Sequence, residues 1–257
     1  MSAVSALHNK RVLVPRGGAW GCAVADELRA HGADPVVAPL IGFATASDAA
    51  ALSAALTRLS DGQYEWLTVT SATTVSVLSE HRVVVPARTR IAAVGLPTAE
   101  SLRAAGFTVS LIPDVDHSAR GLLSTFADRA VPAGTVLVLA SELAKPILAE
   151  GLAAAGFTVD RVGAYRTVPV RVTEHIRDAL RRGAIDAVLV TSGSVAEQLL
   201  RQTEIAPSVT LAAIGDHTAA DARLRGLRVQ VESTEQSASG LIRALENYYH
   251  TDESVTT

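Results

Sequence analysis

Short runs of β-branched and apolar residues alternate along the chain with Ala- and Leu-rich segments of helical period. This alternation is typical of βα units that build a mostly parallel sheet, so we expect an α/β fold. The apolar runs predict strands at 11–14, 35–38, 66–70, 91–94, 108–112, 136–140, 158–162, 187–191, 211–214 and 228–231. The segments of helical period predict helices at 23–30, 49–59, 97–105, 145–155, 172–182 and 218–224.

The series of segments occurs twice along the chain. The repeated blocks are 12–14 with 136–138 at an offset of 124, 67–75 with 188–195 at an offset of 121, and 91–109 with 211–229 at an offset of 120. The last block aligns Gly95 with Gly215 and Thr98 with Thr218. An internal repeat indicates that one supersecondary plan was used twice. We therefore predict two similar α/β domains that face one another across a cleft.

Composition excludes several classes of protein. The 257 residues are 48% hydrophobic and 19% charged, which is enough apolar surface for a full core. Cys22 is the single cysteine, so we expect no disulfide framework, no Cys-rich metal site and a reducing compartment. The chain shows neither a signal peptide nor an apolar run near the ~18 residues of a membrane helix. We expect a cytoplasmic protein without a membrane partner.

Charge also limits the ligands. The 23 basic and 26 acidic residues give a net charge of −3, which creates no general field for nucleic acid. We expect a small-molecule ligand and no nucleic-acid partner. Any anionic ligand would then be held by a local site.

Hydroxyl side chains follow four of the predicted strands. They are Ser71, Thr98, Ser192, Ser194 and Thr218, each at or near the start of a predicted helix. In that position Ser and Thr cap backbone N–H groups, and the helix dipole favours an anion. Ligands of open α/β sheets bind beyond the carboxyl ends of the strands, which is where these turns lie. Simple helix caps and an anion site are both consistent with the pattern.

The turn after the first predicted strand is rich in glycine and contains Arg16. Residues 15–21 read PRGGAWG, whereas a dinucleotide fingerprint requires G-x-G-x-x-G and an acidic residue about 20 positions later. The spacing disfavours a nucleotide-dependent enzyme. Arg16 is either a solvated surface residue or a bidentate partner for a carboxylate at the mouth of the sheet.

Conventional catalytic clusters do not occur in this sequence. We find no nucleophile elbow and no HExxH motif, and the seven histidines have no metal-ligand spacing. His217 lies inside a repeated turn. Tyr165 is one of four tyrosines. Its phenol either needs a buried partner or donates a hydrogen bond at a cleft.

Read in order, these segments resemble the uroporphyrinogen-III synthase family over essentially the whole chain. The segments that carry the resemblance are VLVPR, WLTVTSATTV, AAVGLPTAESLRAAGF, LAEGLAAAGFTVDRVGAYRT, DAVLVTSGSV, AAIGDHTAADARLRGLRV and SASGLIRAL. The resemblance implies two flavodoxin-like parallel-sheet domains that interlace. Residues 1–38 and 168–257 would form one domain and residues 41–165 the other. The hinge segments would lie near 39–40 and 166–167.

The resemblance also implies an activity. The family is a cofactor-free lyase that cyclises hydroxymethylbilane to uroporphyrinogen III, with inversion of the fourth ring and loss of water, in haem, sirohaem and cobalamin biosynthesis. Tyr165 matches the tyrosine proposed to assist departure of the hydroxyl. Thr98 and Thr218 match the threonines of its two glycine-threonine turns, and Ser71 and Ser192 match its strand-end serines. With Ser194, these residues would supply hydrogen-bond donors for substrate carboxylates.

Further expectations concern binding and partners. Lys145 falls where the family often has an arginine, so a carboxylate contact there would lose its bidentate form. Arg16 and Lys145 complete the predicted substrate-binding set. The resemblance implies a monomer without a metal, with transient hand-over of substrate from hydroxymethylbilane synthase. A non-catalytic two-domain binding or sensory module for a small anion is the alternative function.

Overall fold

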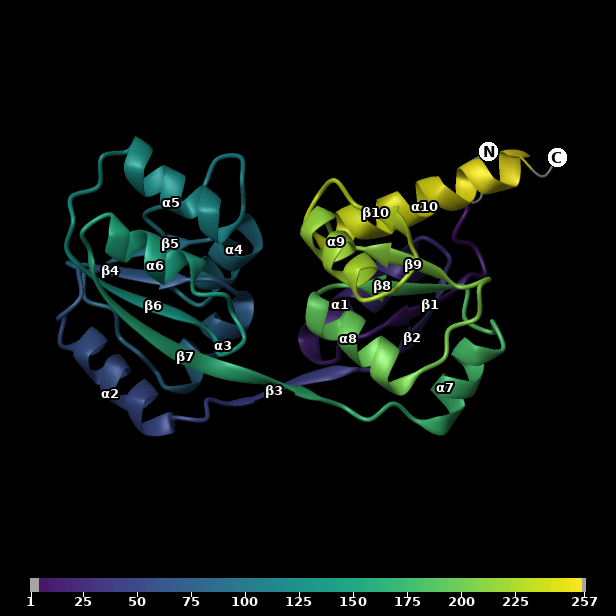
Figure 1. The fold of residues 1–257 in the computed structure, drawn as a ribbon, viewed down its shortest axis with the longest axis horizontal. Coiled ribbons are helices and arrows are strands. Elements are labelled where there is room, and N and C mark those ends of the chain that lie inside the picture. Colours follow the sequence, from purple (N-terminus) through teal and green to yellow (C-terminus); the bar gives the residue numbers. More distant parts are fainter. Residues whose placement is uncertain (1–4, 256–257) are drawn as a thin grey trace. The chain divides into compact units, whose positions relative to one another are not determined.

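The computed structural model describes residues 5–255 and the side chains as far as Thr251. The chain divides into two compact units (Figure 1). Unit 1 comprises Met1–Gly42 and Val168–Thr257, and unit 2 comprises Phe43–Thr167. The chain therefore crosses between the units at Gly42/Phe43 and at Thr167/Val168.

Unit 1 contains a five-stranded sheet in the order β10-β9-β8-β1-β2. Its four ladders are parallel. The helices α1, α8 and α9 follow β1, β8 and β9 and return the chain to the amino end of the next strand. Its elements are β1 (Arg11–Val14), α1 (Gly18–Ala30), β2 (Asp34–Val37), α7 (Glu174–Arg181), β8 (Ala187–Val190), α8 (Gly193–Gln202), β9 (Thr210–Ala213), α9 (Asp216–Leu224), β10 (Val229–Glu232) and α10 (Ala238–Val255).

Unit 2 contains a second five-stranded sheet, in the order β3-β7-β6-β4-β5. The ladders β7–β6, β6–β4 and β4–β5 are parallel. Its elements begin and end with the two strands in which the chain crosses between the units. They are β3 (Ile41–Thr45), α2 (Ala49–Ser60), β4 (Trp66–Val69), α3 (Ala72–Glu80), β5 (Arg90–Ala93), α4 (Leu96–Ala104), α5 (Ala119–Asp128), β6 (Thr135–Ser141), α6 (Ile147–Ala154) and β7 (Thr158–Pro169).

The predicted α/β class is confirmed, and nine of the predicted strands form within one or two residues of their expected starts. The expected strand at 108–112 is wrong, because this segment makes only a single bridge between Leu111 and Ala92. The strand β3 was not predicted. Its alternate residues are exposed, so it lacks the continuous apolar run that marks a buried parallel strand. β7 is much longer than expected and contains Tyr165 instead of ending before it.

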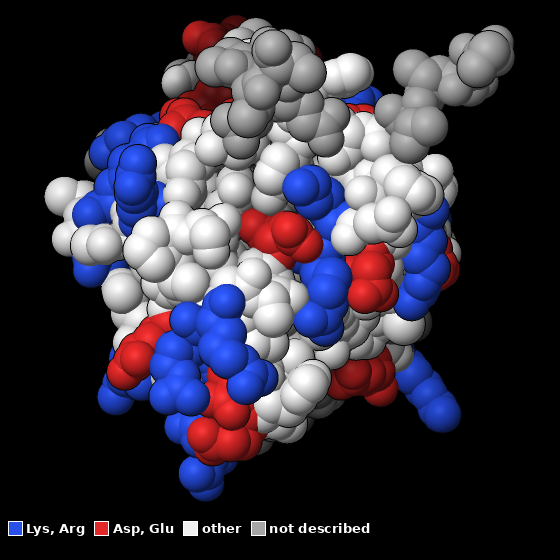
Figure 2. Space-filling model, turned by 90° about the vertical axis from the view of Figure 1, so that its right-hand side faces the viewer, with Lys and Arg blue, Asp and Glu red and all other residues white. Residues whose placement is uncertain are grey.

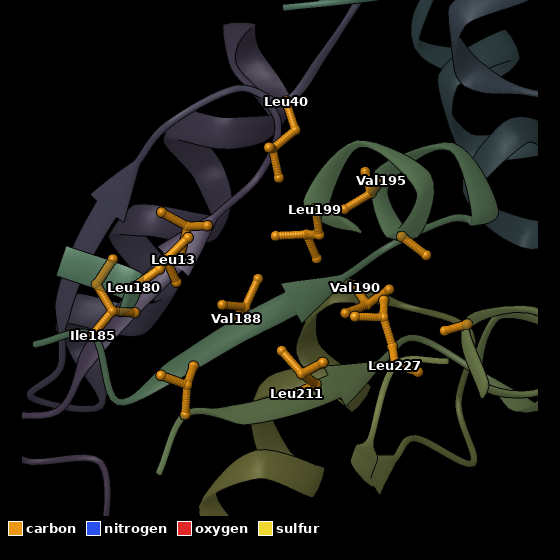
Figure 3. Close-up of a cluster of buried hydrophobic side chains, with 14 of the residues drawn as sticks. Leu13, Leu40, Leu180, Ile185, Val188, Val190, Val195, Leu199, Leu211 and Leu227 are labelled. Atoms are coloured by element: carbon orange, nitrogen blue, oxygen red, sulfur yellow. The ribbon is translucent and has the colours of Figure 1, made fainter. Parts of the chain in front are cut away.

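Each sheet has a hydrophobic cluster on both faces. In unit 1, Leu13, Val188 and Leu211 come from three neighbouring strands and point into one cluster (Figure 3). Their sequence neighbours Val12 and Leu189 belong to the cluster on the opposite face. Successive side chains of a strand point to opposite faces, so a strand buried on both faces must be apolar throughout. This explains why the apolar runs predicted the central strands well.

The two units also share a helix start that the sequence comparison missed. Ser118 Oγ accepts hydrogen bonds from the N–H groups of Arg120 and Gly121, and Ser237 Oγ accepts one from Gly240. The segments DHSARGLL and EQSASGLI align at an offset of 119, which extends the repeat beyond the three blocks. The conserved glycine allows close approach of the preceding loop in both units.

No helix in the described part of the chain is both long and apolar enough to cross a membrane.

The close approach at Gly121 predicts a destabilising substitution. A Cβ atom added there would lie 1.8 Å from the Asp116 carbonyl oxygen, so the loop must move. We expect Gly121→Ala to lower the free energy of unfolding by about 1–3 kcal/mol. Ser124→Ala, at an exposed position of the same helix, is the control and should change stability by less than about 0.5 kcal/mol. Urea unfolding measures both, and equal stability of the two variants would contradict the packing argument.

Candidate functional site

The eight residues predicted to form the site follow the carboxyl ends of strands or lie near them. Parallel strands bring their carboxyl ends to one edge of a sheet, so each unit gathers four of these residues at its carboxyl edge. Unit 1 carries Arg16, Ser192, Ser194 and Thr218, and unit 2 carries Ser71, Thr98, Lys145 and Tyr165. Ser71 and Tyr165 of unit 2 are in direct contact with each other.

Ser71 and Tyr165 form a hydrogen-bonded pair in unit 2. The Ser71 Oγ atom lies 3.1 Å from the Tyr165 Oη atom. Ser71 is the N-cap of α3, where its Oγ accepts a hydrogen bond of 3.2 Å from the Thr74 N–H and lies 3.1 Å from Thr74 Oγ1. The cap therefore also positions the tyrosine, and a chain of three hydroxyl groups runs from the first turn of α3 to the phenol.

A β-bulge places the Tyr165 ring. Ala140 pairs with Gly163 and Ser141 pairs with Tyr165, so Ala164 is an extra residue in β7. A bulge reverses which face of the sheet the following side chains occupy. Tyr165 accordingly joins the hydrophobic cluster that contains Ala164, and only 8% of the residue is exposed. The Phe43 ring packs edge-on against the phenol, with the ring centroids 5.3 Å apart.

In unit 1, aspartate side chains lie at the starts of the helices that carry Ser192 and Thr218. Ser192 caps α8 by accepting a hydrogen bond of 3.3 Å from the Val195 N–H. A Cβ atom on Gly193 would lie 2.0 Å from Asp221 Oδ2, so this carboxylate reaches the first turn of α8. Asp216 occupies the first turn of α9 and accepts a hydrogen bond of 2.7 Å from the His217 N–H. These side chains compensate part of the positive helix ends that we expected to bind anions.

The corresponding helix of unit 2, α4, carries no acidic residue in its first turn. Thr98 lies in the first turn of α4, is 7% exposed, and follows the N-cap Gly95. His117 packs over Gly95, where an added Cβ atom would lie 3.3 Å from its own Cβ atom. Gln236 packs over Gly215 in the same way in unit 1. Sequence reasoning missed His117, although the 119-residue offset aligns it with Gln236.

Arg16 has an aromatic partner that the sequence did not reveal. Its guanidinium carbon lies 4.6 Å from the centroid of the Trp20 ring, one turn into α1. Gly17 is the N-cap of α1, and a Cβ atom on Gly21 would lie 2.2 Å from the Arg16 carbonyl oxygen. Close backbone approach thus explains Gly21, and a positive φ of 67° explains Gly18. The cation–π contact holds the half-buried Arg16 side chain at the carboxyl edge of unit 1.

Lys145 is exposed and precedes α6, which begins two residues later than the predicted helix. The reason is Pro146, which lacks a backbone N–H group and is favoured at a helix start. Lys145 lines a cavity at the carboxyl edge of unit 2. Ser194 and Thr218 are half-buried in the first turns of α8 and α9.

Basic and acidic side chains are interspersed on the face shown in Figure 2. This is consistent with the small net charge of −3. Within residues 5–255, no group of three or more His, Cys, Asp or Glu side chains is arranged to hold a metal ion.

Comparisons with known proteins give a consistent result. Residues 23–243 match the family model described as uroporphyrinogen-III synthase HemD. The chain is 25% identical over 259 residues to a uroporphyrinogen-III synthase of Synechococcus elongatus, covering 94% of this chain and 96% of the relative. It is also 25% identical over 251 residues to a porphyrin biosynthesis protein HemD of Ruminiclostridium josui. That alignment covers 93% of this chain and 49% of the relative, so the chain spans about half the length of that protein.

Solved structures show the same fold. A mutant uroporphyrinogen III synthase from Thermus thermophilus superimposes with a TM-score of 0.62 at 21% identity, covering 93% of this chain and 99% of that structure. A uroporphyrinogen-III synthetase from Helicobacter pylori gives a TM-score of 0.63 at 16% identity, with the same coverage. These similarities confirm the two-domain α/β architecture.

The double role of Ser71 predicts an unequal effect of two matched cap deletions. Ser192→Ala removes a cap alone and should cost about 1 kcal/mol of unfolding free energy. Ser71→Ala removes a cap and the contact with Tyr165, so we expect an additional loss of about 0.5–1.5 kcal/mol. A double-mutant cycle of Ser71→Ala with Tyr165→Phe isolates the coupling in urea unfolding. Coupling near zero would refute the hydrogen bond.

Proposed function

This chain belongs to the uroporphyrinogen-III synthase family, and we propose that it cyclises hydroxymethylbilane to uroporphyrinogen III, with inversion of the fourth ring and loss of water. The match over residues 23–243 favours this synthase over a non-catalytic binding module. The observation that carries the mechanism is the hydrogen-bonded pair of Ser71 and Tyr165 at the carboxyl edge of unit 2.

The first chemical step needs a proton donor. The bond between carbon and the hydroxymethyl oxygen breaks, the oxygen leaves as water with an added proton, and the pyrrole nitrogen lone pair stabilises the azafulvene cation that remains. A carbon of the terminal ring then attacks this cation. The resulting spiro intermediate fragments and recloses to invert the ring. General acid catalysis therefore acts on one oxygen atom, at the start of the sequence.

Tyr165 is the group that we assign to this proton transfer. Ser71 Oγ accepts a hydrogen bond from the Thr74 N–H, which leaves its own hydrogen available for the phenol oxygen. With Ser71 as donor, the Tyr165 O–H is directed to the leaving hydroxyl. The same donor stabilises the phenolate that forms when the proton leaves, because an ionised acceptor strengthens a hydrogen bond. Proton return from the cyclised product restores the phenol.

Selectivity for the inverted isomer requires a defined substrate conformation. Hydroxymethylbilane is flexible and closes without inversion in the absence of an enzyme, so the protein must hold the reacting carbon atoms in position. We assign this role to donors for the substrate carboxylates. In unit 2 they are the backbone N–H groups in the first turn of α3, which Ser71 caps, the first turn of α4 with Thr98, and Lys145. In unit 1 they are Arg16 and the first turns that contain Ser192, Ser194 and Thr218.

The two sets of donors differ in strength. The Asp216 carboxylate lies in the first turn of α9 and opposes a bound anion, and the Asp221 carboxylate reaches the first turn of α8 while pairing with Arg225. The aligned positions in unit 2 are Leu96 and Ser101, which carry no charge. We therefore assign the stronger carboxylate binding to unit 2, the unit that also contains Tyr165.

Substitution of the phenol tests the proposal. Tyr165→Phe should lower kcat about 100-fold or more while the fold remains intact, because general acid catalysis contributes about 10²–10⁴-fold. The measurement is a coupled assay with freshly generated hydroxymethylbilane, followed by oxidation and separation of the porphyrin isomers. Formation of the type III isomer by the wild type establishes the reaction. Unchanged turnover of a stably folded Tyr165→Phe variant would remove the phenol from the mechanism.

Tyr64→Phe is the matched control for loss of a phenol. Tyr64 lies in the same unit, before the amino end of β4, and its Oη contacts Asp160 and accepts a hydrogen bond from Arg58 Nε. Burial raises the pKa of the Tyr64 phenol above its ordinary value of 10.0. This partly buried network is remote from the carboxyl edge, so we expect reduced stability but unchanged kcat.

A further inference from the structure

A cavity of about 290 Å³ opens at the carboxyl edge of unit 2, on the opposite face of the sheet from the Tyr165 phenol. We call it the Arg161 cavity. Its lining comes from the ends of β4, β5 and β6, the start of α5, the loop before α6 with the first residues of that helix, and β7. The lining residues are Thr70, Val94, Ala119, Val138, Ala140, Ala144, Lys145, Ile147, Leu148, Ala149 and Arg161.

The lining combines apolar walls with two cations. Val94, Val138, Ile147 and Leu148 are hydrocarbon, whereas Arg161 and Lys145 are cationic and Thr70 adds a hydroxyl group. None of the residues that line the cavity is acidic. Such a site matches an anion on a short hydrocarbon stem, because the stem loses contact with water while the anion meets a cation.

Arg161 is held in place without an ion pair. Its Nη2 atom donates a hydrogen bond of 2.8 Å to the carbonyl oxygen of Ala144, the residue before Lys145. Neither Arg161 nor Lys145 forms an ion pair with any residue that the structure describes. The two positive charges therefore lie at the same loop without a described carboxylate partner, because Glu142, the acid of that loop, accepts hydrogen bonds from the N–H and Oγ of Ser47 instead.

A second cavity shows what compensated cations look like in this protein. The groove beside α7 and α8 has a volume of about 340 Å³ and is lined by Arg177, Arg181 and Arg201. Each of these arginines pairs with an acid one turn away on its own helix. Acidic side chains of the same helices therefore neutralise these arginines, whereas Arg161 and Lys145 have no such partner within the described part of the chain.

The duplication indicates that the Arg161 cavity belongs to unit 2 alone. Strand β7 pairs with β6 as β2 pairs with β1, at an offset of 124, which aligns Arg161 with Val37. In unit 1, Val37 Cγ1 lies 3.6 Å from the position of a Cβ atom on Gly21. An apolar side chain against a glycine of α1 thus occupies the place where unit 2 has a guanidinium group.

We propose that the Arg161 cavity binds one carboxylate side chain of the substrate, an acetate or propionate arm of a single pyrrole ring, with Arg161 and Lys145 on the carboxylate and the apolar walls around its methylene carbons. This inference rests on the proposed function, since it takes its ligand from that reaction. A volume of about 290 Å³ is close to the lower end of the range for small-molecule sites, roughly 300–1,000 Å³. The cavity accommodates one arm and part of its ring.

Binding of a substrate carboxylate in the Arg161 cavity would also affect which isomer forms. Arg161 and Tyr165 belong to the same strand, so a ring held by Arg161 is fixed relative to the proton donor. Small misplacement of the reacting atoms lowers the rate of the directed closure. Loss of the anchor should therefore favour the spontaneous closure that gives the type I isomer.

Removal of the guanidinium charge tests the proposal. Arg161→Met keeps an unbranched apolar stem and removes the guanidinium group, and we expect KM for hydroxymethylbilane to rise about tenfold, in line with loss of a charge-assisted hydrogen bond. The fraction of type III product should fall as well. Arg161→Lys should recover part of both losses, because it restores the charge but not the bidentate geometry. Lys145→Met should weaken binding in the same direction.

Arg103→Met is the control for loss of one positive charge from unit 2. Arg103 is exposed in the last turn of α4 and is not among the residues that line the cavity. Its KM and isomer ratio should equal those of the wild type. Thermal unfolding of each variant confirms that differences in kinetics do not arise from misfolding.

A binding titration separates this proposal from the proposed function. Uroporphyrin I is a carboxylate-rich macrocycle that does not turn over, and its binding is followed by fluorescence. We expect weaker binding to Arg161→Met than to Arg103→Met. If wild type forms type III product but Arg161→Met keeps its KM, isomer ratio and uroporphyrin affinity, the cavity proposal is wrong and the function stands. If wild type gives only the type I isomer, the proposed function and its carboxylate subsite fail together.

Discussion

One β-bulge in β7 determines where the chemistry of unit 2 lies. Before the bulge, Arg161 pairs with Val138 and shares its face of the sheet, which α5 and α6 cover. After the extra residue Ala164, Tyr165 faces the other side and meets Ser71 at the start of α3. Without the bulge, residues 161 and 165 would share one face, because side chains alternate along a strand. A single inserted residue thus separates a proposed anchor from a proposed acid.

The remainder of the sheet makes this separation rigid. The central strands are apolar on both faces, as Leu137 and Val138 show by belonging to opposite clusters with little or no exposure. Burial of this kind fixes the register of β6, because a slip of one residue would exchange the two faces. β7 pairs along the whole length of β6 and inherits that register. The side chains at the carboxyl edge are consequently held by the core and not by the loops alone.

The sequence predicted those elements whose structure depends on interactions between neighbouring residues. Buried apolar runs predicted the central strands, and a hydroxyl after a strand predicted the caps Ser71 and Ser192, which the hydrogen bonds confirm. It did not predict those elements whose structure depends on partners distant in sequence. The exposed strand β3 forms because β7 extends beside it. The segment 108–112 forms no continuous strand, and its backbone bonds to β5 involve only Ser110 and Leu111. No local pattern contains either fact.

The site shows the same limit. The phenol of Tyr165 was singled out from the sequence, but its partner Ser71 lies 94 residues away and depends on the bulge. Arg161 was overlooked because an arginine in a strand usually reads as a solvated side chain, and its relation to Lys145 follows from the fold of the loop after β6. His117 could have been identified from the sequence, because the repeat continues at an offset of 119 and aligns this residue with Gln236.

Duplication supplied two equal scaffolds, and charge then made them different. Asp216 lies in the first turn of α9 in unit 1, and the Asp221 carboxylate, paired with Arg225, reaches the first turn of α8, whereas the aligned residues of unit 2 are uncharged. Unit 2 adds uncompensated cations at the same edge, and unit 1 places Val37 where unit 2 has Arg161. An acid near a helix start stabilises the folded chain but opposes an anionic ligand. The aspartates of unit 1 therefore favour stability, while unit 2 leaves its positive charge available for a substrate rich in carboxylates.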